Sequence, residues 1–491
     1  RLSFDPDTQA DVTAGECMGT RDGSWSEVWS RYAESPRSYP GVEPLLRRSR
    51  PAGSLPFDHE PWPDLNDQAE ADVRKALEAL PKLDHGLACQ SVVDLDERHG
   101  DRREWVWAQL ERSPLAMVLE PLRRIAEVVP QPIVGSTPDE IAATYSDLGW
   151  QADAAAWEAL ALAPTGEGRM VESVVAHLLL PWLEDSARAF QTAVSQNHLP
   201  SPLEQGVVQA EEGGCLLFAD GLRYDLGHRL ARLLEDQGMR VAVRQRWAAA
   251  PTVTATAKPA VTPAADAIRG FELGETFQAA IAAQEKPANA PNLRNAIQAR
   301  GYQLLGNEMF EAPLSAEARG WLESGEIDTL GHKLGARLSR QLEEELDRLT
   351  HTIVSLIDAG WTSVRVVTDH GWLLVPGGLP KVDLPKHLTA SRWARCAVIS
   401  GDSSPDVGRY PWTWNTAYSF AFAPGVACFN KTEEYAHGGL SIQECLIPDL
   451  LIEPTGERPV QATIASVTWR SLRCFLEVKG AAGVIRADIR L

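Results

Sequence analysis

The chain has 491 residues, of which 44% are hydrophobic, so it can bury a large core and form about two to four domains. Its 67 acidic and 47 basic residues give a formal net charge of −20. This balance argues against an extensive nonspecific nucleic-acid footprint, which normally requires a basic surface. Any DNA contact must therefore use a local basic patch, bound metal ions or a partner protein.

The sequence also lacks the features of a membrane or secreted protein. No apolar run reaches the ~18 to 20 residues of a membrane span, and the N-terminal sequence has no signal pattern. The chain starts at Arg1 rather than Met, which leaves open whether a leader sequence has been trimmed off. The seven cysteines are scattered without a CxxC pair, and Cys215 and Cys396 lie in apolar runs typical of buried free thiols. We therefore expect a cytoplasmic protein with no membrane partner.

The first two predicted segments differ in periodicity. Residues 1–65 are rich in Pro, Gly, Ser and Trp, and we expect irregular structure packed on the rest of the protein, since tryptophans are unusual in a free tail. Residues 66–200 are predicted to form a helical domain. Within it, apolar residues recur at spacings of three and four over 71–83, 103–129 and 170–194.

A polar, proline-bearing stretch at 195–206 marks a boundary, after which strand and helix patterns alternate. This alternation predicts an α/β domain over 207–458, with a mostly parallel sheet flanked by helices. Buried-strand patterns occupy 214–220, 241–247, 363–369, 396–400 and 417–423, and helices are expected near 224–237 and 336–360. Residues 260–325 are expected to form a helical cap insertion over the site. Residues 459–491 alternate like antiparallel strands, as the start of a truncated β domain.

Two aspartates directly follow predicted strands. Asp220 ends the run CLLFAD, and Asp369 ends SVRVVTD, with His370 beside it. Ligands of open α/β sheets bind at the carboxyl ends of strands, so both carboxylates should point into one crevice. Each aspartate can instead serve as a turn former or helix cap.

Further candidate ligands come later in the chain. Asp328 and His332 are four residues apart, which brings them to one face of a helical turn, and this carboxylate and imidazole pair suits Zn²⁺ or Mn²⁺. A loop aspartate with a surface histidine is the alternative. His437 lies in the glycine-rich AHGG. Arg223 follows Asp220 by three residues, and it can reach a phosphoryl oxygen or pair with Asp225.

The segment PTVTAT supplies a candidate nucleophile. A threonine hydroxyl attacks well only beside a cation or base that lowers its pKa. From the residues alone Thr252, Thr254 and Thr256 are equal candidates, and a loop threonine that caps a helix is the alternative.

Taken in order, Asp220, PTVT, DTLGH, TDHG and His437 resemble the alkaline phosphatase superfamily, most closely the PglZ proteins of bacterial BREX phage-defence systems. DGLRYD, PTVTATAKPA, TDHGW and HGGLSIQECLIP are similar to signatures of that family. The resemblance implies an alkaline-phosphatase-like fold with two divalent ions, Zn²⁺ or alternatively Mn²⁺. One ion would be held by Asp328, His332 and His437, and the other by Asp220, Asp369, His370 and the hydroxyl of Thr254, the implied nucleophile.

The resemblance implies a metal-dependent phosphodiesterase, plausibly a nuclease, in antiphage defence. Its partners would be other BREX proteins, with DNA reached through a local patch. In the implied double displacement, Thr254 attacks phosphorus and water then hydrolyses the phosphothreonine. Two alternatives stay open: a phosphomonoesterase or mutase acting on a nucleotide or phosphoprotein, and a BREX assembly scaffold whose metal site is mainly structural.

Overall fold

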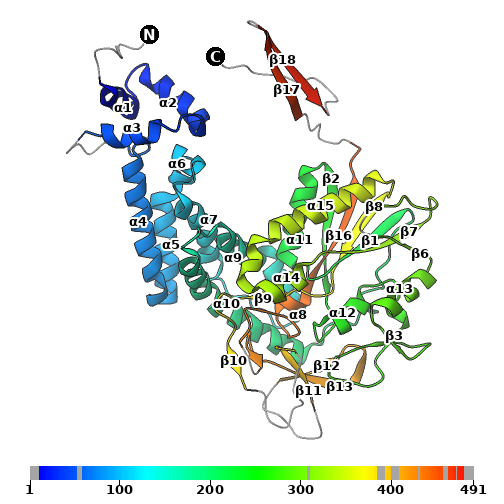
Figure 1. Cartoon of the computed structure of the whole chain (residues 1–491). Helices are drawn as coiled ribbons and strands as arrows, with labels where there is room; N and C mark the ends of the chain where they lie inside the picture. Colours follow the sequence, from blue (N-terminus) through cyan, green and yellow to red (C-terminus); the bar gives the residue numbers. More distant parts are fainter. Residues whose placement is uncertain are drawn as a thin grey trace.

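The structure is a computed structural model that describes residues 10–51, 58–306, 310–383, 393–399, 408–429, 432–456, 463–470 and 473–479. Figure 1 shows a half built from helices beside a half built around a sheet. Over the described ranges, every helix is too short or too polar to cross a membrane.

The central sheet has six strands and is mostly parallel, which confirms the predicted fold class. Strands β8, β1, β7 and β6 pair in parallel, whereas β16 runs antiparallel between β8 and β2. The order across the sheet is β2 (Met239–Trp247), β16 (Leu446–Pro454), β8 (Ser363–Val367), β1 (Gly214–Ala219), β7 (Arg319–Ser324) and β6 (Tyr302–Leu304).

Helices cover both faces of this sheet (Figure 1). Alternate residues of β1 point to opposite faces, so Leu217 packs with α11 (Tyr224–Asp236) and α15 (Leu342–Asp358), while Leu216 and Phe218 pack toward α13 (Ala290–Ala299). Burial on both faces explains why β1 is a continuous apolar run.

The N-terminal segment is helical, so the expectation of irregular structure is wrong over residues 10–51. It forms α1 (Asp11–Thr20), α2 (Trp25–Glu34) and α3 (Val42–Ser49). Trp29 and Leu46 bury their side chains against Val106 and Trp107 of the next helical region. Tertiary packing, rather than local periodicity, therefore stabilises these short helices.

The predicted helical region follows. Its helices are α4 (Pro63–Ala79), α5 (His85–His99), α6 (Val106–Gln109), α7 (Pro114–Val128), α8 (Pro138–Thr144), α9 (Trp150–Leu162) and α10 (Gly168–Gln196). Helix α10 is tied to the α/β half because the Gln191 amide donates to the carbonyls of Ala423, Gly425 and Leu440. One continuous hydrophobic cluster joins these helices to the sheet.

Three parts of the α/β half differ from expectation. Residues 260–325, predicted to be helical, contain α13 but also β3 (Ile268–Arg269), β4 (Ala280–Ile281), β5 (Lys286–Pro287) and the sheet strands β6 and β7. Strand 446–454 was not predicted. The runs at 396–400 and 417–423 belong to a separate antiparallel sheet of β11 (Cys396–Val398), β13 (Asn415–Phe422) and β12 (Gly408–Trp412). An apolar run fixes burial but not the sheet that a strand joins.

At the C-terminus, β17 (Thr463–Arg470) and β18 (Arg473–Lys479) form the expected antiparallel pair, and the predicted strand in 480–491 lies outside the described residues. The six cysteines whose thiols are described are free, and five of them are buried: Cys89, Cys215, Cys396, Cys428 and Cys445.

Candidate metal centre

Three aspartates follow three neighbouring strands at the same edge of the sheet. Asp369 follows β8, Asp220 follows β1, and Asp328 lies in the first turn of α14 (Ile327–Leu334), just after β7. Because these strands are parallel, their carboxyl ends meet. Gly221 makes the approach possible: its φ is +70°, and a Cβ there would lie 3.1 Å from the backbone nitrogen of Asp328.

Two groups of possible ligands result, and Asp328 belongs to both. The first contains Asp328, His332 and His437, and the second contains Asp220, Asp328 and His370. In each group the ligand atoms lie within 4.8 Å of one another. The sequence prediction assigned Asp328 to the first ion alone, whereas the geometry makes it a bridge between the two groups.

The first group is built around two imidazoles. His332 Nε2 lies 2.9 Å from His437 Nε2, which in turn lies 3.4 Å from Asp328 Oδ1. His437 follows β15 (Tyr435–Ala436), and its Nδ1 is 2.8 Å from the carbonyl oxygen of Thr252, so Nε2 faces the cluster. Burial, and then the neighbouring His370, lower the pKa of His437 to about 4, so the ring is neutral at pH 7 and available as a ligand.

The second group lies against the ring of His370. This buried ring stacks on that of His437, with 4.0 Å between centroids. Its Nε2 lies 3.7 Å from Asp369 Oδ2 and 3.4 Å from the Thr254 hydroxyl oxygen. Asp369 therefore lies beside the second group, as predicted. It is not one of the three residues whose ligand atoms all lie within 4.8 Å of one another.

The three threonines, which the sequence could not separate, lie in different surroundings. Thr252 and Thr256 are buried, and their hydroxyls donate to the carbonyls of Gly439 and Phe277 respectively. Thr254 begins α12 (Thr254–Ala260), is half-buried, and is the one whose hydroxyl points to His370.

Burial and neighbouring carboxyl groups destabilise the ionised forms of Asp220 and Asp369. Burial, and then the charge of Asp369, raise the pKa of Asp220 to about 8, and burial followed by Asp328 raises that of Asp369 to about 7. Within the described chain, Asp220 Oδ1 and Asp369 Oδ2 are buried without a hydrogen-bond partner. Unpartnered carboxyl oxygens beside histidine rings are the donor set that a divalent cation completes, so these residues fit the expected ions.

Asp328 is held differently. Burial alone would raise its pKa, but His437, His370 and His332, together with a hydrogen bond from Tyr435, lower it below the usual value. The Tyr435 hydroxyl donates to Asp328 Oδ1 over 2.9 Å. The sequence analysis missed this tyrosine, although its position two residues before His437 in a strand is a usable signal for a shared face.

Glu444 is a second missed residue. It follows Ser441, the cap of α16 (Ile442–Cys445), and its carboxylate accepts from Gly439 N and pairs with the buried Arg395. These contacts fix the loop that carries His437. A lone glutamate in IQEC gave no sign of this role.

Arg223 adopts the ion-pair alternative. Its Nε lies 2.5 Å from Asp225 Oδ1, and the guanidinium stacks on Trp372 at 4.0 Å from the ring centroid. Asp153 is also close, at 3.8 Å. All three charged side chains are buried, so the guanidinium is committed to these contacts.

We expect Arg223→Met to lower the free energy of unfolding by about 3–5 kcal/mol, because it leaves Asp225 as a buried charge without its partner. Urea unfolding would measure this, with the exposed Arg229→Met as the matched control, at about 1 kcal/mol or less. A variant as stable as wild type that has lost hydrolysis would instead indicate a direct role of Arg223 on substrate.

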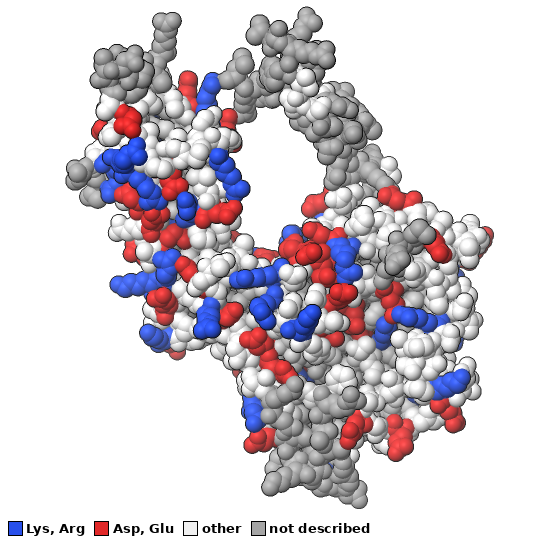
Figure 2. Space-filling view, viewed as in Figure 1, with Lys and Arg blue, Asp and Glu red and all other residues white. Residues whose placement is uncertain are grey.

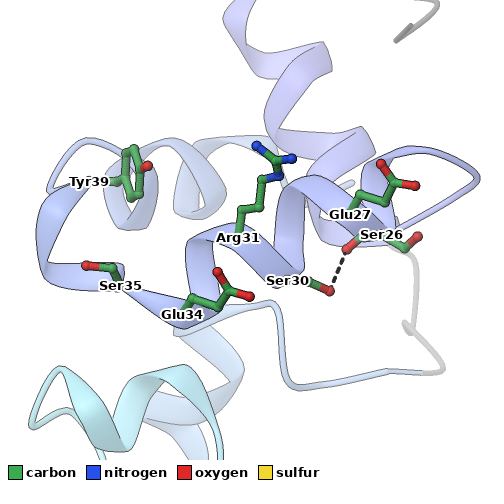
Figure 3. Close-up of a pocket in the computed structure, with 7 residues that line it drawn as sticks. All are labelled: Ser26, Glu27, Ser30, Arg31, Glu34, Ser35 and Tyr39. Carbon is green, nitrogen blue, oxygen red and sulfur yellow. Dashed lines mark hydrogen bonds between the residues drawn. The ribbon is translucent and has the colours of Figure 1, made fainter. Parts of the chain in front are cut away.

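Three hollows formed by described residues, of about 640, 440 and 320 Å³, contain none of the candidate ligands. The polar hollow of about 640 Å³ in Figure 3 lies between α2 and the segment that follows it, and is lined by residues such as Glu27, Arg31 and Tyr39. A smaller one, of about 150 Å³, lies at the centre itself, where Trp393 faces His332 and His437. The volume of a hollow therefore does not identify the candidate metal centre.

No family model matches the chain, and no curated protein matches it. Among solved structures, it is similar to murine ectonucleotide pyrophosphatase/phosphodiesterase 5, with 13% identity, a TM-score of 0.35, and coverage of 49% of this chain and 88% of that one. It is also similar to phosphonoacetate hydrolase from Sinorhizobium meliloti 1021, with 9% identity, a TM-score of 0.32, and coverage of 50% and 90%. Both similarities are weak, and the site rests on its own geometry.

Proposed function

We propose that this protein is a metal-dependent phosphoryl-transfer hydrolase, a phosphodiesterase with Thr254 as its nucleophile. The observation that carries the proposal is the convergence of Asp220, Asp328 and Asp369 on three histidines at one sheet edge, with two buried carboxylate oxygens lacking partners in the described chain. Asp328, His332 and His437 would hold one ion, and Asp220, Asp369 and His370 the other.

When bound, two divalent ions would supply positive charge to the attacking and leaving oxygens and to the phosphoryl group. The mixed imidazole and carboxylate donors favour Zn²⁺ or Mn²⁺ over Mg²⁺ or Ca²⁺, which prefer oxygen ligands. Other residues of the chain orient the candidate ligands: the Tyr435 hydroxyl orients Asp328, and the Thr252 carbonyl orients the His437 ring.

The reaction would proceed in two displacements. Thr254 Oγ1 loses its proton and bonds to phosphorus as the bond to the leaving alcohol breaks, and this proton ends on the leaving alcohol. Water then attacks the phosphothreonine, which restores the Thr254 hydroxyl and releases a phosphomonoester. A diester fits better than a monoester, because a dianionic phosphate would need a free guanidinium and Arg223 is committed to Asp225.

The antiphage role, the BREX partners and a nucleic-acid substrate rest on the sequence resemblance. A monoesterase or mutase, and a scaffold with a structural metal site, are the competing functions. Figure 2 shows Lys and Arg interspersed with Asp and Glu over the visible face, so a DNA contact there would use a small patch.

Hydrolysis of bis(4-nitrophenyl) phosphate and of 4-nitrophenyl phosphate, each with Zn²⁺ or Mn²⁺, tests this function. We expect the diester to be cleaved with the higher kcat/KM. Preference for the monoester would support the monoesterase alternative. Metal binding that stabilises the fold without hydrolysis of either ester would support the scaffold.

A further inference from the structure

Two cations share one carboxylate close to the candidate metal centre. Lys258 Nζ lies 2.8 Å from Glu323 Oε2, while Arg294 Nε lies 3.0 Å from Glu323 Oε1. One carboxylate cannot neutralise two full positive charges, so the group carries a net charge of about +1. Burial would raise the pKa of Glu323, but Arg294 and then Lys258 lower it to about 2, so its carboxylate is ionised.

The chain brings this group near Thr254 and Asp220. Lys258 follows Thr254 by four residues in α12, which places both on one helix face, ~6 Å apart along the axis. Its ammonium lies 4.2 Å from the centroid of the Phe218 ring. Phe218 is the penultimate residue of β1, and Asp220 directly follows that strand.

A cavity of about 320 Å³ is lined by two members of this group, Arg294 and Glu323. It lies between α13 and the ends of β6 and β7, and Arg294, Trp321 and Glu323 line it together with the backbone turn at Leu304–Gly306. Its volume is within the range of small-ligand sites. The Arg294 side chain is 51% exposed. Its Nε and Nη2 donate to Glu323, so Nη1 is the guanidinium nitrogen that has no partner among the described residues.

We propose that Lys258 and Arg294 bind a second phosphate group of the substrate, next to the phosphodiester that is cleaved. The substrate class would then be a phosphodiester with a flanking phosphate, as in an oligonucleotide. This inference rests on the proposed function. The Nη1 group of Arg294 can donate to a phosphate oxygen while Nε and Nη2 stay on Glu323, and the lysine adds a point charge between the two phosphates.

The test compares nitrophenyl esters that differ in one phosphate. Thymidine 5′-(4-nitrophenyl phosphate) is assayed with and without a 3′-phosphate, and the 3′-nitrophenyl ester with and without a 5′-phosphate. We expect the added phosphate to lower KM about tenfold in one of the two pairs, as one charge-assisted contact allows. Arg294→Ala should remove that difference while leaving KM for the unphosphorylated ester unchanged, and Lys258→Met should also remove the difference.

Arg300→Ala, which removes an exposed arginine next to α13, is the matched control and should preserve the difference. An identical KM within both pairs would overturn the second-phosphate site.

Binding of thymidine 3′,5′-bisphosphate to Thr254→Ala, measured by calorimetry, gives a readout independent of turnover. We expect the additional substitution Arg294→Ala to weaken this binding about tenfold. If Arg294→Ala weakens this binding as expected but the wild type hydrolyses none of the esters, the second-phosphate site is supported and the proposed function is wrong. If Arg294→Ala leaves the affinity for the bisphosphate unchanged, the second-phosphate site is wrong.

Discussion

Replacing Thr254 with alanine is expected to reduce diester hydrolysis on the order of 10³-fold or more, because no other hydroxyl of the segment faces the metal centre. The fold should be unaffected. Thr254 is half-buried, so its loss should change the free energy of unfolding by about 0.5 kcal/mol or less. Steady-state kinetics with bis(4-nitrophenyl) phosphate and urea unfolding measure the two effects separately.

Thr254→Ser is the matched variant, since it keeps a hydroxyl at the same place and should retain measurable turnover. Thr252→Ala and Thr256→Ala leave buried partners unsatisfied, so each should lose about 1–3 kcal/mol of stability while the folded protein stays active. Wild-type rates for Thr254→Ala would eliminate the covalent route. Attack by water without a protein nucleophile would then be the better account.

Removal of divalent ions, or the substitution Asp328→Asn, is expected to abolish hydrolysis. Asp328 would hold one ion, and it also lies within 4.8 Å of the ligand atoms of Asp220 and His370 at the other, so one substitution affects both sites. Activity of chelated wild type should return with Zn²⁺ or Mn²⁺, and these ions should also raise the melting temperature. Saturation at about 100 times Kd corresponds to about 2.7 kcal/mol of stabilisation. Differential scanning calorimetry with and without metal measures this.

Asp266→Asn is the control for Asp328→Asn, because Asp266 is an exposed aspartate that pairs with Arg300. It should keep both the activity and the metal-dependent melting shift. Full activity of the chelated wild type would show that the cluster of carboxylates and histidines does not act through a metal.

The sequence predicted the parts of the site that follow directly from strand ends and helical spacing. Asp220 and Asp369 follow short apolar strands, and Asp328 and His332 lie four residues apart in a helix, so local patterns sufficed to bring them together. The placement of Thr254 required the resemblance, since Thr252 and Thr256 have the same composition around them. Only the three-dimensional contacts of each hydroxyl separate the three.

Other features depend on contacts between distant segments, which no local pattern encodes. Strand β7 lies in a segment that we expected to be helical. Its sequence, RGWLES, gives no strand signal because it contains a glycine and two charged residues. In the structure the glycine is buried, and Glu323 pairs with Lys258. Arg223 had two equal interpretations until Asp153, 70 residues away, and Trp372 were found beside it. The N-terminal helices likewise form against Val106 and Trp107.

Anomalous diffraction at the zinc edge, from crystals grown with Zn²⁺, tests the two-metal centre most directly. The proposed function predicts two peaks ~3.5–4 Å apart. One should lie between Asp328, His332 and His437, and the other between Asp220, Asp369 and His370. Peaks confined to surface residues, or a single peak that contacts neither Asp220 nor Asp328, would contradict it.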